Sequence, residues 1–159
     1  MVGMINLTVP GLGELNLKHV VFDVNGTLAV DGVLLPGVSN MLTFLKEHLE
    51  IHLLTADTHG KQAQIDRQLN LEAVRIQAGE EREQKSAYIH QLGPDTTAAV
   101  GQGANDALML EAARIGICVI SPEGTALETL LKADLIVPDI NSALEILQNA
   151  TRLKASLRK

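Results

Sequence analysis

Polar side chains that could perform chemistry are concentrated in four short segments of this sequence. Three of these segments directly follow apolar, β-branched runs: Asp23-Val24-Asn25-Gly26-Thr27, Thr55-Ala56-Asp57 and 101–106 (GQGAND). The fourth is a lysine, Lys85, in a stretch with helical spacing. Carboxylates can act as nucleophiles or hold a hard cation such as magnesium. Because ligands bind beyond the carboxyl ends of the strands in an open parallel sheet, these positions are the candidates for a functional site.

Each of these residues also has a simpler structural interpretation. A lone Asp23 could end a strand and start a turn, and Thr55 could do the same. Asn105 and Asp106 could cap the helix that follows them. Most lysines on helices are exposed to solvent, so the interest of Lys85 depends on the other three segments.

The elements that must position these residues alternate along the chain, which predicts a parallel sheet with crossover helices. The expected strands are Lys18–Val24, Ile51–Thr55, Ala73–Gln77, Ala98–Gly101, Ile115–Ile120 and Leu135–Val137. The expected helices, which carry apolar residues at helical spacing, are Ser39–Leu49, Lys61–Leu69, Glu81–Leu92, Asp106–Ala113, Thr125–Ala133 and Ser142–Asn149. The predicted fold class is α/β, a three-layer, doubly wound, Rossmann-like and mainly parallel sheet in a single domain over 1–159.

Three further segments lie outside this alternation. Ile5–Val9 followed by a Pro-Gly turn and Glu14–Val21 predicts an N-terminal hairpin on the edge of the sheet. Leu28–Pro36, with Asp31-Gly32 in its middle, predicts a second, small hairpin. The basic tail Thr151–Lys159 is expected to extend the last helix or to end in solvent.

Taken together and in this order, the four segments resemble the four motifs of the haloacid dehalogenase (HAD) superfamily, over nearly the whole chain. VFDVNGTLAVDG resembles the first motif, DxDGT, and LLTAD resembles the second, a Thr or Ser at a strand end. Lys85 matches the third, a helical lysine for which Lys61 is the second choice, and VGQGANDALML resembles the fourth, GDGxND. The sequence looks most similar to small soluble proteins described as P-type-ATPase-like, which share DxNGTLAVDG, LTADT and a G-N/Q-G-x-ND stretch.

The resemblance implies a role for each residue. Asp23 would be the nucleophile that accepts the phosphoryl group, with a cation offsetting its repulsion from the phosphate. Thr55, the backbone N–H of Ala56 and Lys85 would hold phosphate oxygens. The implied cofactor is Mg2+, and its expected ligands are Asp23, Asn25 through its backbone carbonyl, Gln102 and Asp106.

Two departures from the family pattern bear on the mechanism. Asn25 stands where the family has the acid/base Asp, and a carboxamide cannot shuttle protons near neutral pH. Gln102 stands where the family has a carboxylate ligand, so magnesium binding should weaken. We therefore expect slow hydrolysis unless the leaving group is good, and Asn25 joins the candidate catalytic residues Asp23, Thr55 and Lys85.

The chain has no room for a large cap, because the gaps from Thr27 to the next helix and from Thr55 to Lys85 are short. An open site predicts a phosphorylated small molecule or a phosphoprotein as substrate, with a second copy or a partner chain as a possible cover.

Composition excludes several other classes of function. Aromatic residues make up 2% of the chain and the net charge is −6, which argues against nucleic acid as a partner. No 18-residue apolar run and no signal-peptide pattern is present, so neither membrane spanning nor export is predicted. The single Cys118, in an apolar context, indicates a buried thiol and a cytoplasmic location.

Two alternatives to an enzyme of phosphoryl transfer stay open at this point. The first is a catalytically weak or inactive module that senses phosphate or magnesium, which Asn25 and Gln102 permit. The second is a response-regulator-like receiver, which fits less well because the third expected strand ends at Arg75-Ile76-Gln77 without an Asp. The histidines at 19, 48, 52, 59 and 90 show no spacing typical of a transition-metal site, so surface or core roles are expected for them.

Overall fold

The computed structural model describes residues 3–57 and 60–159, and its centre is a six-stranded sheet. The strand order is β10-β9-β8-β3-β6-β7, and every pair of neighbours is parallel. The strands are β3 (His19–Asp23), β6 (Glu50–Thr55), β7 (Val74–Arg75), β8 (Thr97–Gly101), β9 (Ile115–Val119) and β10 (Leu135–Val137). Along the chain, β6 and β7 extend the sheet on one side of β3, and β8, β9 and β10 extend it on the other side, so the strand order reverses between β3 and β8. The candidate residues lie at this point, where ligands bind in such folds.

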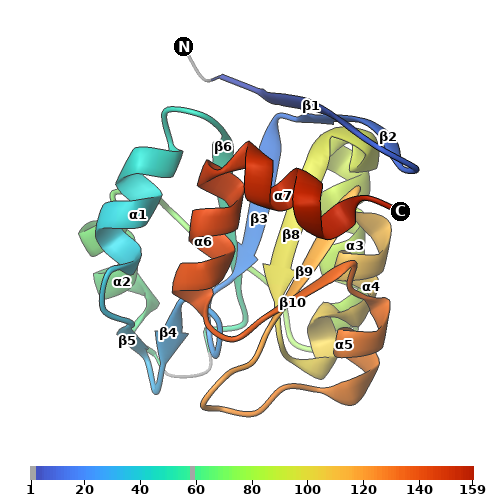
Figure 1. Cartoon of the computed structure of the whole chain (residues 1–159). Helices are drawn as coiled ribbons and strands as arrows, with labels where there is room; N and C mark the ends of the chain where they lie inside the picture. The colour runs from blue at the N-terminus through green and yellow to red at the C-terminus, as the bar shows by residue number, and fades with distance from the viewer. Residues whose placement is uncertain (1–2, 58–59) are drawn as a thin grey trace.

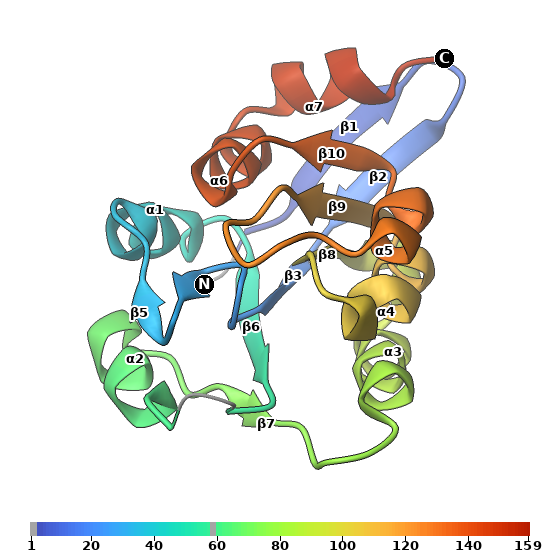
Figure 2. The same cartoon turned by 90° about the horizontal axis from the view of Figure 1, so that it is seen from below.

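Helices cover both faces of this sheet, so the molecule has three layers (Figure 1 and Figure 2). One face carries α1 (Val38–Leu45), α2 (Gln62–Leu69) and α6 (Ile140–Gln148). The other face carries α3 (Glu81–Leu92), α4 (Ala107–Ala112) and α5 (Leu127–Lys132). Two 3-10 turns, η1 (Pro94–Thr96) and η2 (Ala104–Asp106), precede β8 and α4. The predicted fold class is therefore confirmed.

The two faces have separate aliphatic cores, because successive side chains of a strand point to opposite sides. In β3, Val20 and Phe22 pack into the core under α1 and α6, while Val21 packs into the core under α3 and α4. Both cores are almost free of aromatic side chains, as the composition requires. The same alternation turns Asp23, at the end of β3, towards the face covered by α3 and α4.

The N-terminal hairpin forms as predicted, but its predicted place on the sheet edge is wrong. Its strands β1 (Ile5–Val9) and β2 (Gly13–Leu17) form a sheet of their own, outside the six-stranded one. They lie against α7 (Ala150–Leu157), as Figure 1 shows. The edge strands of the central sheet are therefore β10 and β7. The hairpin joins the rest of the molecule through its side chains, since Val9, Leu15 and Leu17 are buried in the core.

The C-terminal segment is a separate helix rather than an extension of α6. Asn149 breaks the α6 helix and its side chain accepts a hydrogen bond from the backbone N–H of Arg152, so it caps α7. Leu153 and Leu157 of α7 are buried. The expectation of a solvated tail is therefore wrong for most of this segment, because two leucines at helical spacing cover the hairpin.

The second hairpin, β4 (Ala29–Val30) and β5 (Val33–Leu34), also forms where it was predicted. It is small, and α1 follows it at Val38. In the described residues between β6 and α3 the chain forms only α2 and β7, so no large cap is present there. Within the described part of the chain, every helix is too short or too polar to span a bilayer.

Candidate active site

Asp23 lies at the carboxyl end of the central strand β3, where the neighbouring strands also end. The parallel register pairs Asp23 with Leu54 and Phe22 with Val100, so Thr55 and Gly101 come to the same edge. The side chain of Asp23 is almost completely buried, since the residue is 5% exposed. The sheet thus brings the first, second and fourth candidate segments together, as the sequence predicted.

Lys85 lies between two carboxylates that are far apart in the sequence. Its Nζ is 2.9 Å from Asp23 Oδ1 and 2.8 Å from Asp106 Oδ1, and it also donates to Asn105 Oδ1 at 3.3 Å. Lys85 comes from the buried side of α3 and is only 1% exposed. Lys61, the second choice for this role, is exposed just before α2. The geometry therefore selects Lys85.

The electrostatics of this cluster leave one negative charge uncompensated, because two carboxylates face one ammonium group. Burial and, second, the nearby Asp106 carboxylate raise the pKa of Asp23, while Lys85 and the Thr27 hydroxyl lower it, and the net result is a pKa of about 7. Burial by itself lowers the pKa of Lys85, but the carboxylates of Asp23 and Asp106 together outweigh burial, raise this pKa and keep the amine protonated. A cluster of this charge takes up a proton or a cation.

Asp106 is held by the backbone of its own loop. Its Oδ2 accepts hydrogen bonds from the N–H of Gln102 at 3.0 Å and of Gly103 at 3.1 Å. To accept these bonds, the carboxyl group of Asp106 packs closely against Gly101, where a Cβ would lie 2.6 Å from its carboxyl carbon. A glycine at position 101 is therefore needed for the carboxylate to reach Lys85. The side chain of Asp106 turns back to the loop instead of capping α4.

Asn25 and Thr55 contact each other at the carboxyl ends of β3 and β6. The amide nitrogen of Asn25 donates to Thr55 Oγ1 at 3.0 Å, and the backbone N–H of Asp57 donates to the same oxygen at 2.9 Å. Since the hydroxyl accepts both bonds, its own proton is available for a phosphate oxygen. Ala56, which was expected to offer its N–H, lies between these residues and is partly exposed.

Gln102 connects the site to a turn that the sequence did not assign to it. Its Nε2 donates to the carbonyl of Gly124 at 3.3 Å. The amide packs directly on Gly26, where a Cβ would lie 2.4 Å from Nε2 and where φ is +86°. Ser121 Oγ donates to the carbonyl of Gly26 at 2.5 Å from the same turn. The loop that contains Asn25 is thus held by 121–124.

Two further residues of the site, Thr27 and Asn105, lie within the first and fourth motifs, but the sequence gave them no catalytic or ligand role. Thr27 is fully buried and its Oγ1 donates to Asp23 Oδ2 at 3.0 Å. Asn105 accepts a hydrogen bond from Lys85 and donates to Glu81 Oε2 at 3.1 Å. Thr27 orients the candidate nucleophile and Asn105 orients the lysine. Their place inside the first and fourth motifs is the signal that could have identified them.

The donor set fits a hard divalent cation. Asp23 and Asp106 both approach the single cationic group of Lys85, so their carboxylates converge from two loops. Oxygen ligands and an excess negative charge are what Mg2+ prefers in proteins. Gln102 lies beside them at the same sheet edge and is 8% exposed. Three of the ligands that the sequence proposed, Asp23, Gln102 and Asp106, therefore lie at one edge of the sheet.

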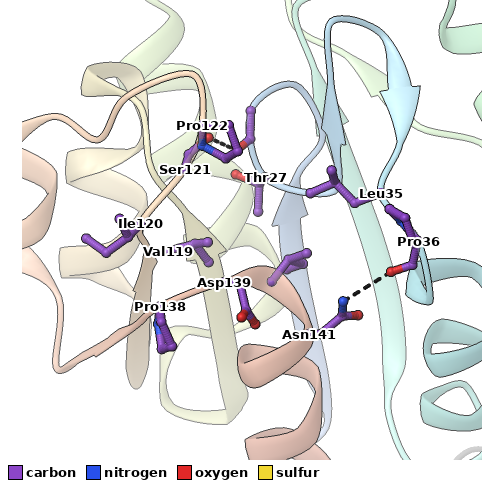
Figure 3. Close-up of a pocket in the computed structure, with 12 residues that line it drawn as sticks. Thr27, Leu35, Pro36, Val119, Ile120, Ser121, Pro122, Pro138, Asp139 and Asn141 are labelled. Atoms are coloured by element: carbon purple, nitrogen blue, oxygen red, sulfur yellow. Dashed lines mark hydrogen bonds between the residues drawn. The ribbon is translucent and has the colours of Figure 1, made fainter.

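A cavity next to the site has a volume of about 540 Å3. It lies between the carboxyl ends of β3 and β9 and the start of α6, and Figure 3 shows Leu35, Ile120 and Pro138 around it. Asp139 and Asn141 add polar groups, and Asn141 donates to the carbonyl of Pro36 at 3.1 Å. Thr27, whose hydroxyl contacts Asp23, lines this cavity and Asp23 does not, so the cavity lies beside the candidate nucleophile.

Sequence comparisons connect the chain to two archaeal proteins. No family model matches it. It is 52% identical over 60 residues to the uncharacterised protein MJ0073 of Methanocaldococcus jannaschii, which is 38% of this chain and 64% of that protein. It is 51% identical over 39 residues to the uncharacterised protein MJ0072 of the same organism, which is 24% of this chain and 89% of that protein. The chain therefore belongs to the same family as MJ0072, most of which it covers. It covers 64% of the length of MJ0073.

Solved structures with a similar fold include two phosphatases and the catalytic domain of an ATPase. The cobalt-bound deoxy-D-mannose-octulosonate 8-phosphate phosphatase of Haemophilus influenzae matches with a TM-score of 0.63 and 13% identity, over 82% of this chain and 86% of that one. The 3-deoxy-D-manno-octulosonate 8-phosphate phosphatase of Moraxella catarrhalis, in complex with magnesium, phosphate and KDO, matches with a TM-score of 0.61 and 15% identity, over 89% and 94%. The catalytic domain of the CPx-ATPase CopB-B matches with a TM-score of 0.61 and 26% identity, over 74% of this chain and 46% of that one.

Proposed function

This chain is a cap-less protein with the HAD fold, and we propose that it catalyses Mg2+-dependent phosphoryl transfer or phosphate-ester hydrolysis through an aspartyl phosphate on Asp23. The observation that carries this proposal is the convergence of Asp23 and Asp106 on Lys85, with distances of 2.9 Å and 2.8 Å to its Nζ. The three groups come from three segments and are all buried. Burying two carboxylates with one ammonium is costly for a fold, so such a cluster suggests a functional role.

In the first step, a carboxylate oxygen of Asp23 attacks phosphorus, the bond from phosphorus to the ester oxygen breaks, and that oxygen leaves with the electron pair. Thr27 and Lys85 orient the attacking carboxylate through the hydrogen bonds described above. Thr55 supplies a hydroxyl proton for a phosphate oxygen, with the N–H of Ala56 next to it. These fixed donors stabilise the charge that develops on the transferred group.

The second step is where Asn25 matters. Water attacks phosphorus of the aspartyl phosphate, the bond from phosphorus to the Asp23 oxygen breaks, and Asp23 regains its carboxylate. Inorganic phosphate leaves, and the proton of water passes to solvent. Asn25 can neither protonate the leaving oxygen nor accept the proton of water, and its amide is already engaged with Thr55 Oγ1. We therefore expect efficient reaction only with good leaving groups, and a long-lived aspartyl phosphate.

Magnesium would be held by Asp23, the backbone carbonyl of Asn25 and Asp106, with the Gln102 amide oxygen as a neutral ligand. When bound, the ion offsets the negative charge of the phosphate as the carboxylate approaches. Gln102 contributes no charge, so we expect weaker affinity than a site with one more carboxylate would have. The Moraxella phosphatase, which has the same fold, is in complex with magnesium and phosphate, and this supports magnesium as the cofactor we propose.

The substrate class proposed here is a phosphorylated small molecule or a phosphoprotein. The described residues form no large cap over Asp23, and the turn 121–124 reaches the small hairpin, where Glu123 accepts a hydrogen bond from the N–H of Asp31 at 3.1 Å. These contacts hold the loop edge without covering the site. A second copy or a partner chain could supply the cover that excludes water.

The direct test is Mg2+-dependent phosphate release from acetyl phosphate and p-nitrophenyl phosphate. Asp23→Asn should reduce the rate at least about a thousandfold, because the nucleophile is lost. Asn25→Asp should raise the rate on p-nitrophenyl phosphate by about a hundredfold, because proton transfer contributes on this scale. Lys61→Ala is the matched control and should change neither rate.

A catalytically weak module that binds phosphate or magnesium is the second candidate, favoured by the amides at Asn25 and Gln102. It predicts Mg2+-dependent binding of a phosphate mimic such as beryllofluoride without turnover of either substrate. Turnover that is unchanged in Asp23→Asn would contradict both candidates.

A further inference from the structure

The opposite edge of the sheet carries a second polar cluster, formed by the same two strands. His19 is the first residue of β3 and Glu50 is the first residue of β6, and the parallel register pairs them directly. His52 lies two residues further along β6 and therefore on the same face as Glu50. His19 and His52, which are 33 residues apart in the sequence, thus lie side by side, although their spacing gave no sign of a shared site. His59 lies outside the described residues.

The three side chains present their ligand atoms to one another at short range. His19 Nδ1 is 3.1 Å from His52 Nε2 and 3.3 Å from Glu50 Oε2, and His52 Nε2 is 3.8 Å from Glu50 Oε1. Ligand atoms bound tetrahedrally to zinc at 2.0–2.1 Å are about 3.3 Å apart. The observed separations are therefore those of three corners of a zinc tetrahedron, with little rearrangement needed.

The orientation of His52 is set by Tyr88 on α3. The distance from His52 Nδ1 to the Tyr88 hydroxyl is 2.9 Å, and the two rings meet edge to face. With Nδ1 engaged by the hydroxyl, Nε2 is the nitrogen that points to His19 and Glu50. Metal-binding histidines are usually oriented in this way by a hydrogen bond to the other ring nitrogen.

The cluster is accessible from solvent on one side. The side chains of His19 and His52 are 17% and 12% exposed, whereas that of Glu50 is 56% exposed. A cavity of about 260 Å3 borders it, lined by Gly3, Met4, Lys18, His19 and Glu50. This arrangement leaves an entry path and room for a water molecule in a fourth position.

We propose that His19, Glu50 and His52 form a second metal site, which binds a transition-metal ion of the zinc class with two imidazoles, one carboxylate and a water. The site is separate from the one at Asp23. His19 and Asp23 are the two ends of β3, about 13 Å apart along an extended strand. A bound ion would join the starts of β3 and β6, the strands that carry Asp23 and Thr55 at their other ends. It would thus stabilise the pairing on which the catalytic edge depends.

The alternative is a hydrogen-bonded chain from Glu50 through the two histidines to Tyr88, without affinity for metal. Calorimetric titration of the intact chain with Zn2+ in excess Mg2+ separates the two, because Mg2+ prefers the oxygen ligands at Asp23. The metal site predicts one Zn2+ per chain in the wild type. His52→Gln and Glu50→Gln should each weaken Zn2+ binding by more than tenfold, and Tyr88→Phe by about tenfold.

His90→Gln is the matched control, since His90 is exposed on α3, and it should bind Zn2+ as the wild type does. Co2+ should give the intense visible absorption of a tetrahedral complex in the wild type and lose it in His52→Gln. Asp23→Asn should keep full Zn2+ binding, which makes this site independent of the proposed enzyme activity. Zn2+ binding that survives in His52→Gln, that disappears in Asp23→Asn, or that is absent from the wild type would overturn the proposal.

Discussion

The two ends of the β3–β6 pair carry polar clusters of opposite character. At the carboxyl ends, Asp23, Asp106 and Lys85 are buried, and two carboxyl groups face one ammonium group. At the amino ends, His19 and His52 are partly exposed, and the chain of contacts ends in the exposed carboxylate of Glu50. The carboxyl-end cluster collects residues from separate crossover units, whereas the amino-end cluster needs only two adjacent strands and Tyr88.

This difference indicates how strongly each cluster is tied to the fold. The buried cluster is coupled to packing through Gly101, Thr27 and the backbone around Gln102, so changes in it should affect both stability and chemistry. The exposed cluster can change with little effect on the metal-free fold. The following predictions test this contrast, from the largest expected effect to the smallest.

Removing the ammonium group from the buried cluster should have the largest effect on stability. Lys85→Met leaves Asp23 and Asp106 facing each other without a counter-charge, which should lower the free energy of unfolding by about 3–5 kcal/mol. Urea denaturation at neutral pH measures this, with Lys61→Met as the control, expected within about 0.5 kcal/mol of the wild type. If Lys85→Met is as stable as the control, the charges of this cluster are not coupled to folding.

Adding one methyl group beside Asp106 should have the next largest effect. Gly101→Ala places a Cβ 2.6 Å from the carboxyl carbon of Asp106, so the loop must shift, at a cost of about 1–3 kcal/mol. The displaced carboxylate should also weaken Mg2+ binding. Gly3→Ala, at the other cluster, meets only contacts of 3.4 Å or longer and should be neutral. Thermal denaturation with and without Mg2+ distinguishes the two variants.

The raised pKa of Asp23 predicts a pH dependence of stability in the metal-free protein. The pKa is 3.8 for a free side chain and about 7 in the folded state, so between these values the folded state binds more protons than the unfolded state. The contribution of Asp23 to stability is therefore complete below pH 4 and is lost as pH rises through about 7.

Asp23→Asn should remove this dependence, so its stability relative to the wild type should increase from pH 5 to pH 8. Urea denaturation in the presence of EDTA at several pH values measures this. Asp31→Asn, in the tip of the small hairpin, is the control and should follow the wild type. A difference between Asp23→Asn and the wild type that does not change with pH would show that Asp23 is not titrating in this range.

The smallest effect is expected at the exposed cluster. Tyr88→Phe removes one hydrogen bond to His52 and keeps the ring, so the metal-free protein should lose no more than about 1 kcal/mol. Urea denaturation in EDTA, compared with His90→Gln, measures this cost. A loss as large as that of Lys85→Met would mean that the two ends of the strand pair are equally coupled to folding.

The sequence by itself determined the alternating elements, the α/β class and the residues of the carboxyl-end cluster. Strand and helix periodicity are local properties, and ends of parallel strands meet at one edge whatever the order of the strands. The HAD motifs are compact in sequence, so Asp23, Thr55 and 101–106 could be identified without knowing the register. Thr27 and Asn105 lay within these motifs, and only their contacts assigned them a role.

The tertiary structure alone decided everything that depends on register and on packing between distant segments. It selected Lys85 over Lys61, because only the buried side of α3 faces Asp23. It placed the N-terminal hairpin outside the six-stranded sheet with α7 packed against it, because the hairpin and α7 bury their leucines in the same core. It also placed His19 beside His52, since strand pairing brings together residues whose separation of 33 positions carries no local signal.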